Sequence, residues 1–164
     1  MFTFGFASSQ NITPSATYED AKTKKVKGLV NTYITESGES FSVGDTITLG
    51  SAFSEGKTYS YIFQNAGIEL YPLSNTAVGE TAVIKGIKIQ RKNAIVNTTK
   101  IENYVYGLRI LLEDALKTKE VKSKIMSSDE ALAELKRAKD KLDLDLITQE
   151  EFNQKREELS PLIK

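Results

Sequence analysis

The chain has 164 residues, with 22 basic and 22 acidic side chains and a formal net charge of zero. A neutral chain has no overall electrostatic attraction to nucleic acid or to a membrane surface. It contains neither Cys nor His, which excludes disulfides, thiolate and imidazole metal ligands, and catalytic arrangements of the Ser-His-Asp or Cys-His type. We therefore expect a protein without enzymatic activity, cofactor or bound metal.

Residues 1–21 read as an apolar and then polar N-terminal tail. Residues 1–9, MFTFGFASS, are apolar and end in small residues. This stretch is either the remnant of a secretory signal peptide, cleaved after Ser9, or an ordinary apolar tail. The first interpretation predicts a periplasmic or secreted protein, and the second a cytoplasmic one. No stretch approaches the roughly 20 apolar residues that span a bilayer, so we expect no integral membrane segment.

Residues 22–118 alternate short β-branched or aromatic segments with turn residues. Strands are expected in GLVNTYITE, DTITLG, KTYSYIFQ, TAVIKGIKIQ, NAIVNTT and NYVYGLRI. Five to six short strands in about 80 residues predict a small antiparallel β-barrel. The segment SVGDTITLG resembles the turn and strand of SH3-like small barrels. A short helix is expected at residues 112–117, and a polar linker at residues 119–126.

Residues 127–164 contain two helix-start signals. Ser127 with Glu130, and Thr148 with Glu151, match capping boxes, in which a hydroxyl and a carboxylate satisfy the first amides of a helix. They predict helices over about 128–142 and 149–159, joined as a hairpin. The expected fold class is therefore α+β: an N-terminal antiparallel β-barrel of five to six strands with a short helix, followed by a C-terminal two-helix hairpin.

The two expected helices carry narrow apolar stripes. Helices of three to four turns are marginally stable alone, so we expect the stripes to contact either the barrel or another copy of the hairpin. The predicted interaction residues are Leu132, Leu135, Leu142, Ile147, Phe152 and Leu159.

The stretch EALAELKRAKDKLDLDLITQEEFNQKREEL resembles a SHOCT domain, the short C-terminal domain of many bacterial proteins. The resemblance covers residues 128–160 and rests on the leucine-bearing first helix, the LIT-x-EEF restart, and Lys155 followed by Leu159. Asp145 stands where the family usually has Gly, and Leu144 where a polar residue is expected. The resemblance implies a hairpin that mediates oligomerisation or partner contact, without catalysis.

An alternative function is binding of nucleic acid or another polyanion. Tyr59 and Tyr61 alternate along one expected strand and can stack bases, while Lys85, Lys88 and Arg91 add positive charge. The same residues are also explained by an aromatic cluster in the core beside a solvated basic strand face. A second basic run, KTKKVKG, has two interpretations: contact with anionic lipid or nucleic acid, or, more typically, an edge strand protected against aggregation.

Overall fold

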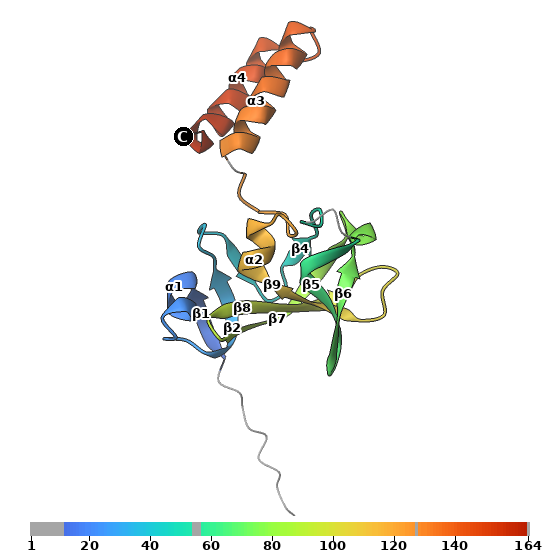
Figure 1. Ribbon diagram of the computed structural model, residues 1–164. Coiled ribbons are helices and arrows are strands. Elements are labelled where there is room, and N and C mark those ends of the chain that lie inside the picture. The colour runs from blue at the N-terminus through green and yellow to red at the C-terminus, as the bar shows by residue number, and fades with distance from the viewer. Residues whose placement is uncertain (1–11, 54–56, 127, 164) are drawn as a thin grey trace, which may run out of the picture. The chain divides into compact units, whose positions relative to one another are not determined.

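The computed structural model describes residues 12–53, 57–126 and 128–163. The chain divides into two compact units, Met1–Ser123 and Lys124–Lys164. The first unit is built on a nine-stranded sheet with short helices, and the second is a helical hairpin (Figure 1).

The first unit begins with a strand and a one-turn helix, and it ends with a second short helix. The bounds of its elements are β1 (Thr13–Thr17), α1 (Tyr18–Lys22), β2 (Gly28–Ile34), β3 (Ser40–Ser42), β4 (Thr46–Thr48), β5 (Thr58–Ala66), β6 (Glu69–Ser74), η1 (Asn75–Ala77), β7 (Thr81–Gln90), β8 (Asn93–Lys100), β9 (Gly107–Leu111) and α2 (Leu112–Lys117). The helix expected at residues 112–117 is thereby confirmed. The signal-peptide interpretation of residues 1–9 lies outside the described residues.

The strands form one mixed sheet. Their order is β1-β2-β7-β8-β9-β5-β6, with β3 also paired to β2 and β4 to β7. β1 runs parallel to β2, and the other pairs are antiparallel. β7 links two parts of the sheet, because residues 87–89 pair with β2 and residues 81–83 pair with β4.

The expected small antiparallel barrel of five to six strands is wrong. The sheet is larger and open, since β1 and β6 lie at opposite ends of the strand order instead of pairing with each other. β1, β3 and β6 form in segments whose sequence predicts no strand. β1 contains Pro14 and β6 contains Pro72. Proline lacks an amide donor, so it is tolerated in a strand at a sheet edge, where one side of the strand has no neighbour to receive a hydrogen bond.

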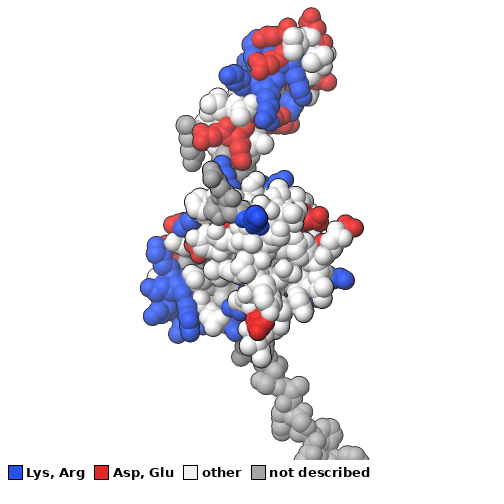
Figure 2. Space-filling view, turned by 45° about the vertical axis from the view of Figure 1, so that its right-hand side comes forward, with Lys and Arg blue, Asp and Glu red and all other residues white. Residues whose placement is uncertain are grey.

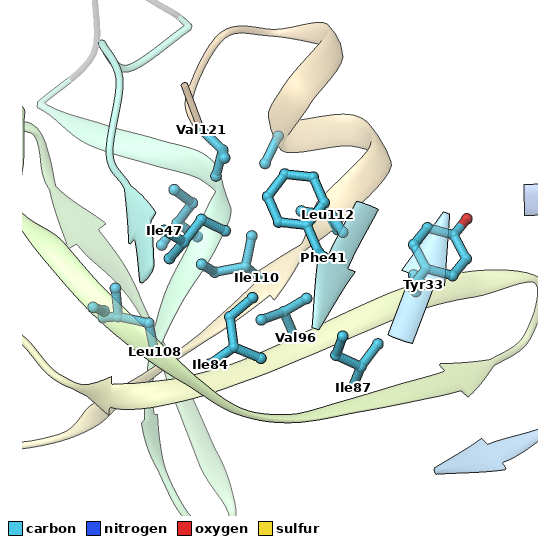
Figure 3. Close-up of a cluster of buried hydrophobic side chains, with 14 of the residues drawn as sticks. Tyr33, Phe41, Ile47, Ile84, Ile87, Val96, Leu108, Ile110, Leu112 and Val121 are labelled. Carbon is cyan, nitrogen blue, oxygen red and sulfur yellow. The ribbon is translucent and has the colours of Figure 1, made fainter. Parts of the chain in front are cut away.

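The centre of the core is a row of aliphatic residues that crosses five neighbouring strands. Val30, Ile87, Val96, Ile110 and Ile62 are successive cross-strand partners, and each is at most 2% exposed. Figure 3 shows Ile87, Val96 and Ile110 directed into the same cluster of side chains. Burying one such aliphatic side chain contributes about 1.5–3 kcal/mol, so this row holds the centre of the sheet together.

α2 covers part of this core. Leu112 and Ala115 of the helix are fully buried. The Tyr33 hydroxyl, at the end of a buried ring, donates to Glu113 Oε1 at 2.8 Å. Burial, followed by the hydrogen bond to Glu113, raises the pKa of Tyr33. The Tyr33 hydroxyl is therefore paired with a carboxylate of α2 rather than solvated.

A buried carboxylate fixes the chain segment that follows α2. Glu120 has no exposed surface, and its two oxygens accept from the backbone amides of Ser60 at 2.7 Å, Tyr61 at 2.8 Å and Phe53 at 3.2 Å. A buried carboxylate is stable only when its oxygens are hydrogen-bonded. Glu120 thus attaches the end of the first unit to β5.

Gly50 lies against the same segment and completes this attachment, which we call the Glu120 junction. Its amide donates to the Glu120 carbonyl at 2.8 Å, and its carbonyl accepts from the Tyr59 hydroxyl at 2.6 Å. Burial, with a smaller effect of Glu120, raises the pKa of Tyr59 to about 12. Val121 then bridges to Leu49, so the junction is closed by both backbone and side chains.

The second unit contains α3 (Ser128–Asp143), α4 (Gln149–Leu159) and η2 (Ser160–Leu162), which confirms both helices expected there. The expected cap at Ser127 lies outside the described residues. At the start of α4, Thr148 Oγ1 accepts from the Glu151 amide at 3.2 Å, and the Glu151 carboxylate accepts from the Thr148 amide at 2.7 Å. This confirms the capping box, and the bond from the Thr148 amide lowers the pKa of Glu151.

Candidate functional site

The interior of the hairpin is small. Among residues 124–126 and 128–163, the buried side chains are Ala131, Ala138 and Leu159. The two alanines are seven residues apart and lie on one face of α3, where small side chains allow α4 to approach closely. An ion pair of 3.1 Å between Lys155 and Glu134 joins the two helices, and Lys155 lowers the pKa of Glu134.

The structure divides the predicted interaction residues into two groups. Leu135, Leu142, Ile147 and Phe152 are half-buried, and Leu159 is buried. Leu132 is 55% exposed, because the face of α3 that carries the buried residues runs through Ala131 and Ala138. Most of the predicted stripe is thus used partly inside the hairpin, and Leu132 lies beside it.

Two further leucines, which the sequence did not single out as contacts, are exposed at the turn between the helices. Leu144 is 69% exposed and Leu146 is 68% exposed. They flank Asp145, whose φ of 55° lies in the left-handed region. The amide of Leu146 donates to the Lys141 carbonyl at 2.9 Å and that of Asp145 to the Leu142 carbonyl at 3.0 Å. This is a Schellman ending, and it sets the backbone of the turn that carries both leucines.

Replacing Asp145 with glycine is expected to stabilise the hairpin by about 0.5–1 kcal/mol. Glycine adopts the left-handed conformation without a Cβ clash, and the change removes a negative charge from a helix C-terminus. Thermal unfolding of the full chain, followed by circular dichroism at 222 nm, measures the effect. Asp140→Gly, inside α3, is the matched control and should destabilise by about 0.3 kcal/mol, the difference in helix propensity between Asp and Gly. Equal effects of the two variants would contradict this account of the turn.

The candidate polyanion residues do not gather on one surface. Tyr59 is 2% exposed, and Tyr61 packs partly against the core. Both lie on β5, which β8 and β9 separate from β7 in the strand order. Lys85 and Lys88 are exposed on β7, and Arg91 follows that strand in its turn. The aromatic and basic halves of the predicted face therefore belong to different parts of the sheet.

The structure instead brings the two basic runs of the sequence together. β2 begins where β7 ends, with Gly28 opposite Ile89, so residues 24–28 lie beside the turn between β7 and β8. A pocket of about 440 Å³ lies there. Its lining comprises Ala21, Lys24, Val26, Lys27, Gly28, Lys88, Ile89, Gln90, Arg91 and Lys92. Figure 2 shows Lys and Arg side chains clustered at one side of the first unit.

Comparisons of the chain with models of known families, with curated proteins and with solved structures find no match. Within the described ranges, no helix combines the length and the apolarity needed to cross a bilayer. The same ranges contain no group of three or more Asp or Glu side chains placed to hold a metal ion. The exposed leucines of the hairpin and the basic pocket are the two surface features that suggest a function.

Proposed function

We propose that the chain is a non-enzymatic interaction protein that self-associates through its C-terminal hairpin. The observation that carries the proposal is the distribution of leucines in the hairpin. Within its described residues, two of the three buried side chains are alanines, whereas Leu132, Leu144 and Leu146 are more than half exposed. The resemblance of residues 128–160 to a SHOCT domain supports the same function.

The hairpin is small, which suggests that it requires a second surface for stability. Domains below about 40 residues usually require disulfides, metals or oligomerisation for stability. The chain has no Cys and no His, so cross-links and the usual structural zinc ligands are absent from it. Burying exposed leucines against a second hairpin provides apolar area that α3 and α4 do not provide for each other.

The charges on the two helices favour a second copy as the partner. On the second half of α3 the exposed cations outnumber the exposed acids, and on α4 the exposed acids outnumber the exposed cations. The exposed charges are Lys136, Arg137, Lys139 and Lys141 with Asp140 and Asp143 on α3, and Glu150, Glu151, Glu157 and Glu158 with Arg156 on α4. In a two-fold dimer the same surface is used by both copies. Placing α3 of one copy against α4 of the other brings surfaces of opposite net charge together, which favours that arrangement.

Leu144→Glu combined with Leu146→Glu is expected to raise the dissociation constant of the dimer about 100-fold, equivalent to about 2.7 kcal/mol. The variant would place two unpaired carboxylates in a desolvated contact. Sedimentation velocity over a range of concentrations measures the constant, and circular dichroism at 222 nm verifies that the helices persist.

The matched control for this variant is Ile68→Glu. Ile68 lies between β5 and β6 in the first unit and is fully exposed, so the change has similar chemistry at a site outside the hairpin. The control should dimerise like the unmodified chain. The proposal fails if the control dissociates the dimer as strongly as the hairpin variant, or if the hairpin variant retains the original constant.

A further inference from the structure

The pocket between α1, β2 and the β7–β8 turn is strongly cationic. Half of its lining residues are Lys24, Lys27, Lys88, Arg91 and Lys92, and no carboxylate is among the lining residues that the structure describes. Like charges this close repel one another unless an anion lies between them. The composition of the pocket therefore fits an anionic ligand.

The acids that the structure describes do not neutralise the cations of the pocket. Asp20 is the acid of α1 closest in sequence to Lys24 and Lys27. It forms an ion pair of 3.4 Å with Lys25, which does not line the pocket. In the described parts of the chain, none of the five lining cations forms an ion pair with a carboxylate within 4.0 Å. Their donors remain available to a ligand.

The backbone of the pocket places cations at positions that favour other residues. Lys24, Arg91 and Lys92 have φ values of 61°, 50° and 72°. Arg91 and Lys92 are the central residues of a two-residue hairpin turn, because Gln90 pairs with Asn93. Asn-Gly is the favoured pair in such turns. Non-glycine residues held in this conformation are often found at functional sites, and here three of them line one pocket.

The shape and lining of the pocket narrow the class of ligand. Its volume lies within the usual range for small-molecule sites. Ala21, Val26 and Ile89 are its apolar residues, and no aromatic side chain is among the described residues that line it. Single-stranded nucleic acids bind through aromatic stacking along an extended groove, and this site has neither feature. Clustered Lys and Arg donors suit phosphate oxygens.

We infer that this pocket binds a compact anion carrying several phosphate groups, either free in solution or as the headgroup of a lipid. All lining residues of the pocket belong to the first unit, so this inference does not rest on the proposed self-association of the hairpin. Lys24 and Lys27 approach from the segment after α1, and Lys88, Arg91 and Lys92 approach from β7 and its turn. The phosphates occupy the space between these two groups of cations.

Titration of the full chain with sodium tripolyphosphate, followed by calorimetry in low-salt buffer, tests the inference. The double variant Arg91→Asn/Lys92→Gly is expected to weaken binding at least about 10-fold, since two charge-assisted contacts are lost. The same variant should raise the Tm by about 2–4 °C, because it installs the favoured turn residues. Loss of binding with gain of stability separates a ligand contact from a structural role.

Lys88→Ala and Lys85→Ala form a matched pair on β7. Both lysines are exposed, but Lys88 lines the pocket and Lys85 does not. Lys88→Ala should weaken tripolyphosphate binding several-fold, and Lys85→Ala should leave it within about two-fold. Vesicles containing phosphatidylinositol bisphosphate distinguish the two sources: binding that tripolyphosphate displaces indicates a headgroup, and binding of tripolyphosphate alone indicates a free anion.

The inference is overturned if the full chain does not bind tripolyphosphate at about 1 mM, a concentration that detects even weak sites. It is equally overturned if Arg91→Asn/Lys92→Gly binds tripolyphosphate as well as the unmodified chain. Tighter binding to a single-stranded oligonucleotide than to tripolyphosphate, with equal losses in the Lys85 and Lys88 variants, would point instead to an extended nucleic-acid surface.

Discussion

Glu120→Ala is expected to destabilise the first unit by about 3 kcal/mol or more. The substitution leaves the amides of Phe53, Ser60 and Tyr61 without their carboxylate acceptor in a buried site, and each unsatisfied buried group costs about 1–3 kcal/mol. The chain has no Trp, and all seven of its Tyr residues precede residue 124. Urea unfolding followed by tyrosine fluorescence therefore measures the first unit separately from the hairpin.

Two controls make the Glu120 result specific. Glu120→Gln keeps one acceptor oxygen but places an amide donor opposite backbone donors, so its cost should be intermediate. Glu102→Ala removes an exposed carboxylate and should change stability by less than about 0.5 kcal/mol. If Glu120→Ala were as mild as Glu102→Ala, the Glu120 junction would not be what anchors this end of the first unit.

Gly50→Ala is expected to cost about 2–3 kcal/mol at the same junction. A Cβ at this position would lie 2.0 Å from the Lys119 carbonyl oxygen and 3.1 Å from the carbonyl carbon. These are backbone atoms, so the chain must move and disturb the hydrogen bond from Gly50 to Glu120. Overpacking of this kind typically costs 1–3 kcal/mol. The loss is measured as a lower urea midpoint in the same tyrosine-fluorescence experiment.

Gly86→Ala is the matched control for Gly50→Ala. Gly86 also lies in the sheet region, within β7, but a Cβ added there meets no atom within 4 Å. Its replacement should be neutral or slightly stabilising, because alanine restricts the unfolded chain. Equal losses at the two positions would mean that glycine is required for its flexibility, and not because the Lys119 carbonyl lies against Gly50.

The strongest local patterns in the sequence predicted the elements that depend on local interactions. The helix at Leu112–Lys117 and the capping box at Thr148 are determined within a few residues of chain, and both are present. The open sheet was not predictable in the same way. β1 reads TPSAT, without alternation, and forms because β2, which follows after α1 and a short loop, supplies a parallel neighbour. Whether a sheet closes into a barrel also depends on pairing between strands far apart in the sequence. Here β1 and β6 do not pair, and the sheet stays open.

The two candidate functional surfaces also depend on structure that the local sequence patterns do not predict. The exposure of Leu146 depends on the Schellman ending at Asp145, where the sequence indicated only an unusual residue. The basic pocket was missed because Lys24 and Lys92 belong to separate runs, each of which resembles a solvated strand face. Only the pairing of Gly28 with Ile89 places the runs together. Tyr59, for which the sequence left both a base-stacking surface and a core position open, hydrogen-bonds Gly50 in the core.

Sedimentation equilibrium of the unmodified full chain tests self-association through the hairpin most directly. The chain has a mass of 18.2 kDa. We predict that the measured mass rises toward twice this value as the concentration increases through about 1–100 μM, the range in which a micromolar dimer forms. A mass that stays at 18.2 kDa throughout this range would contradict the proposed function.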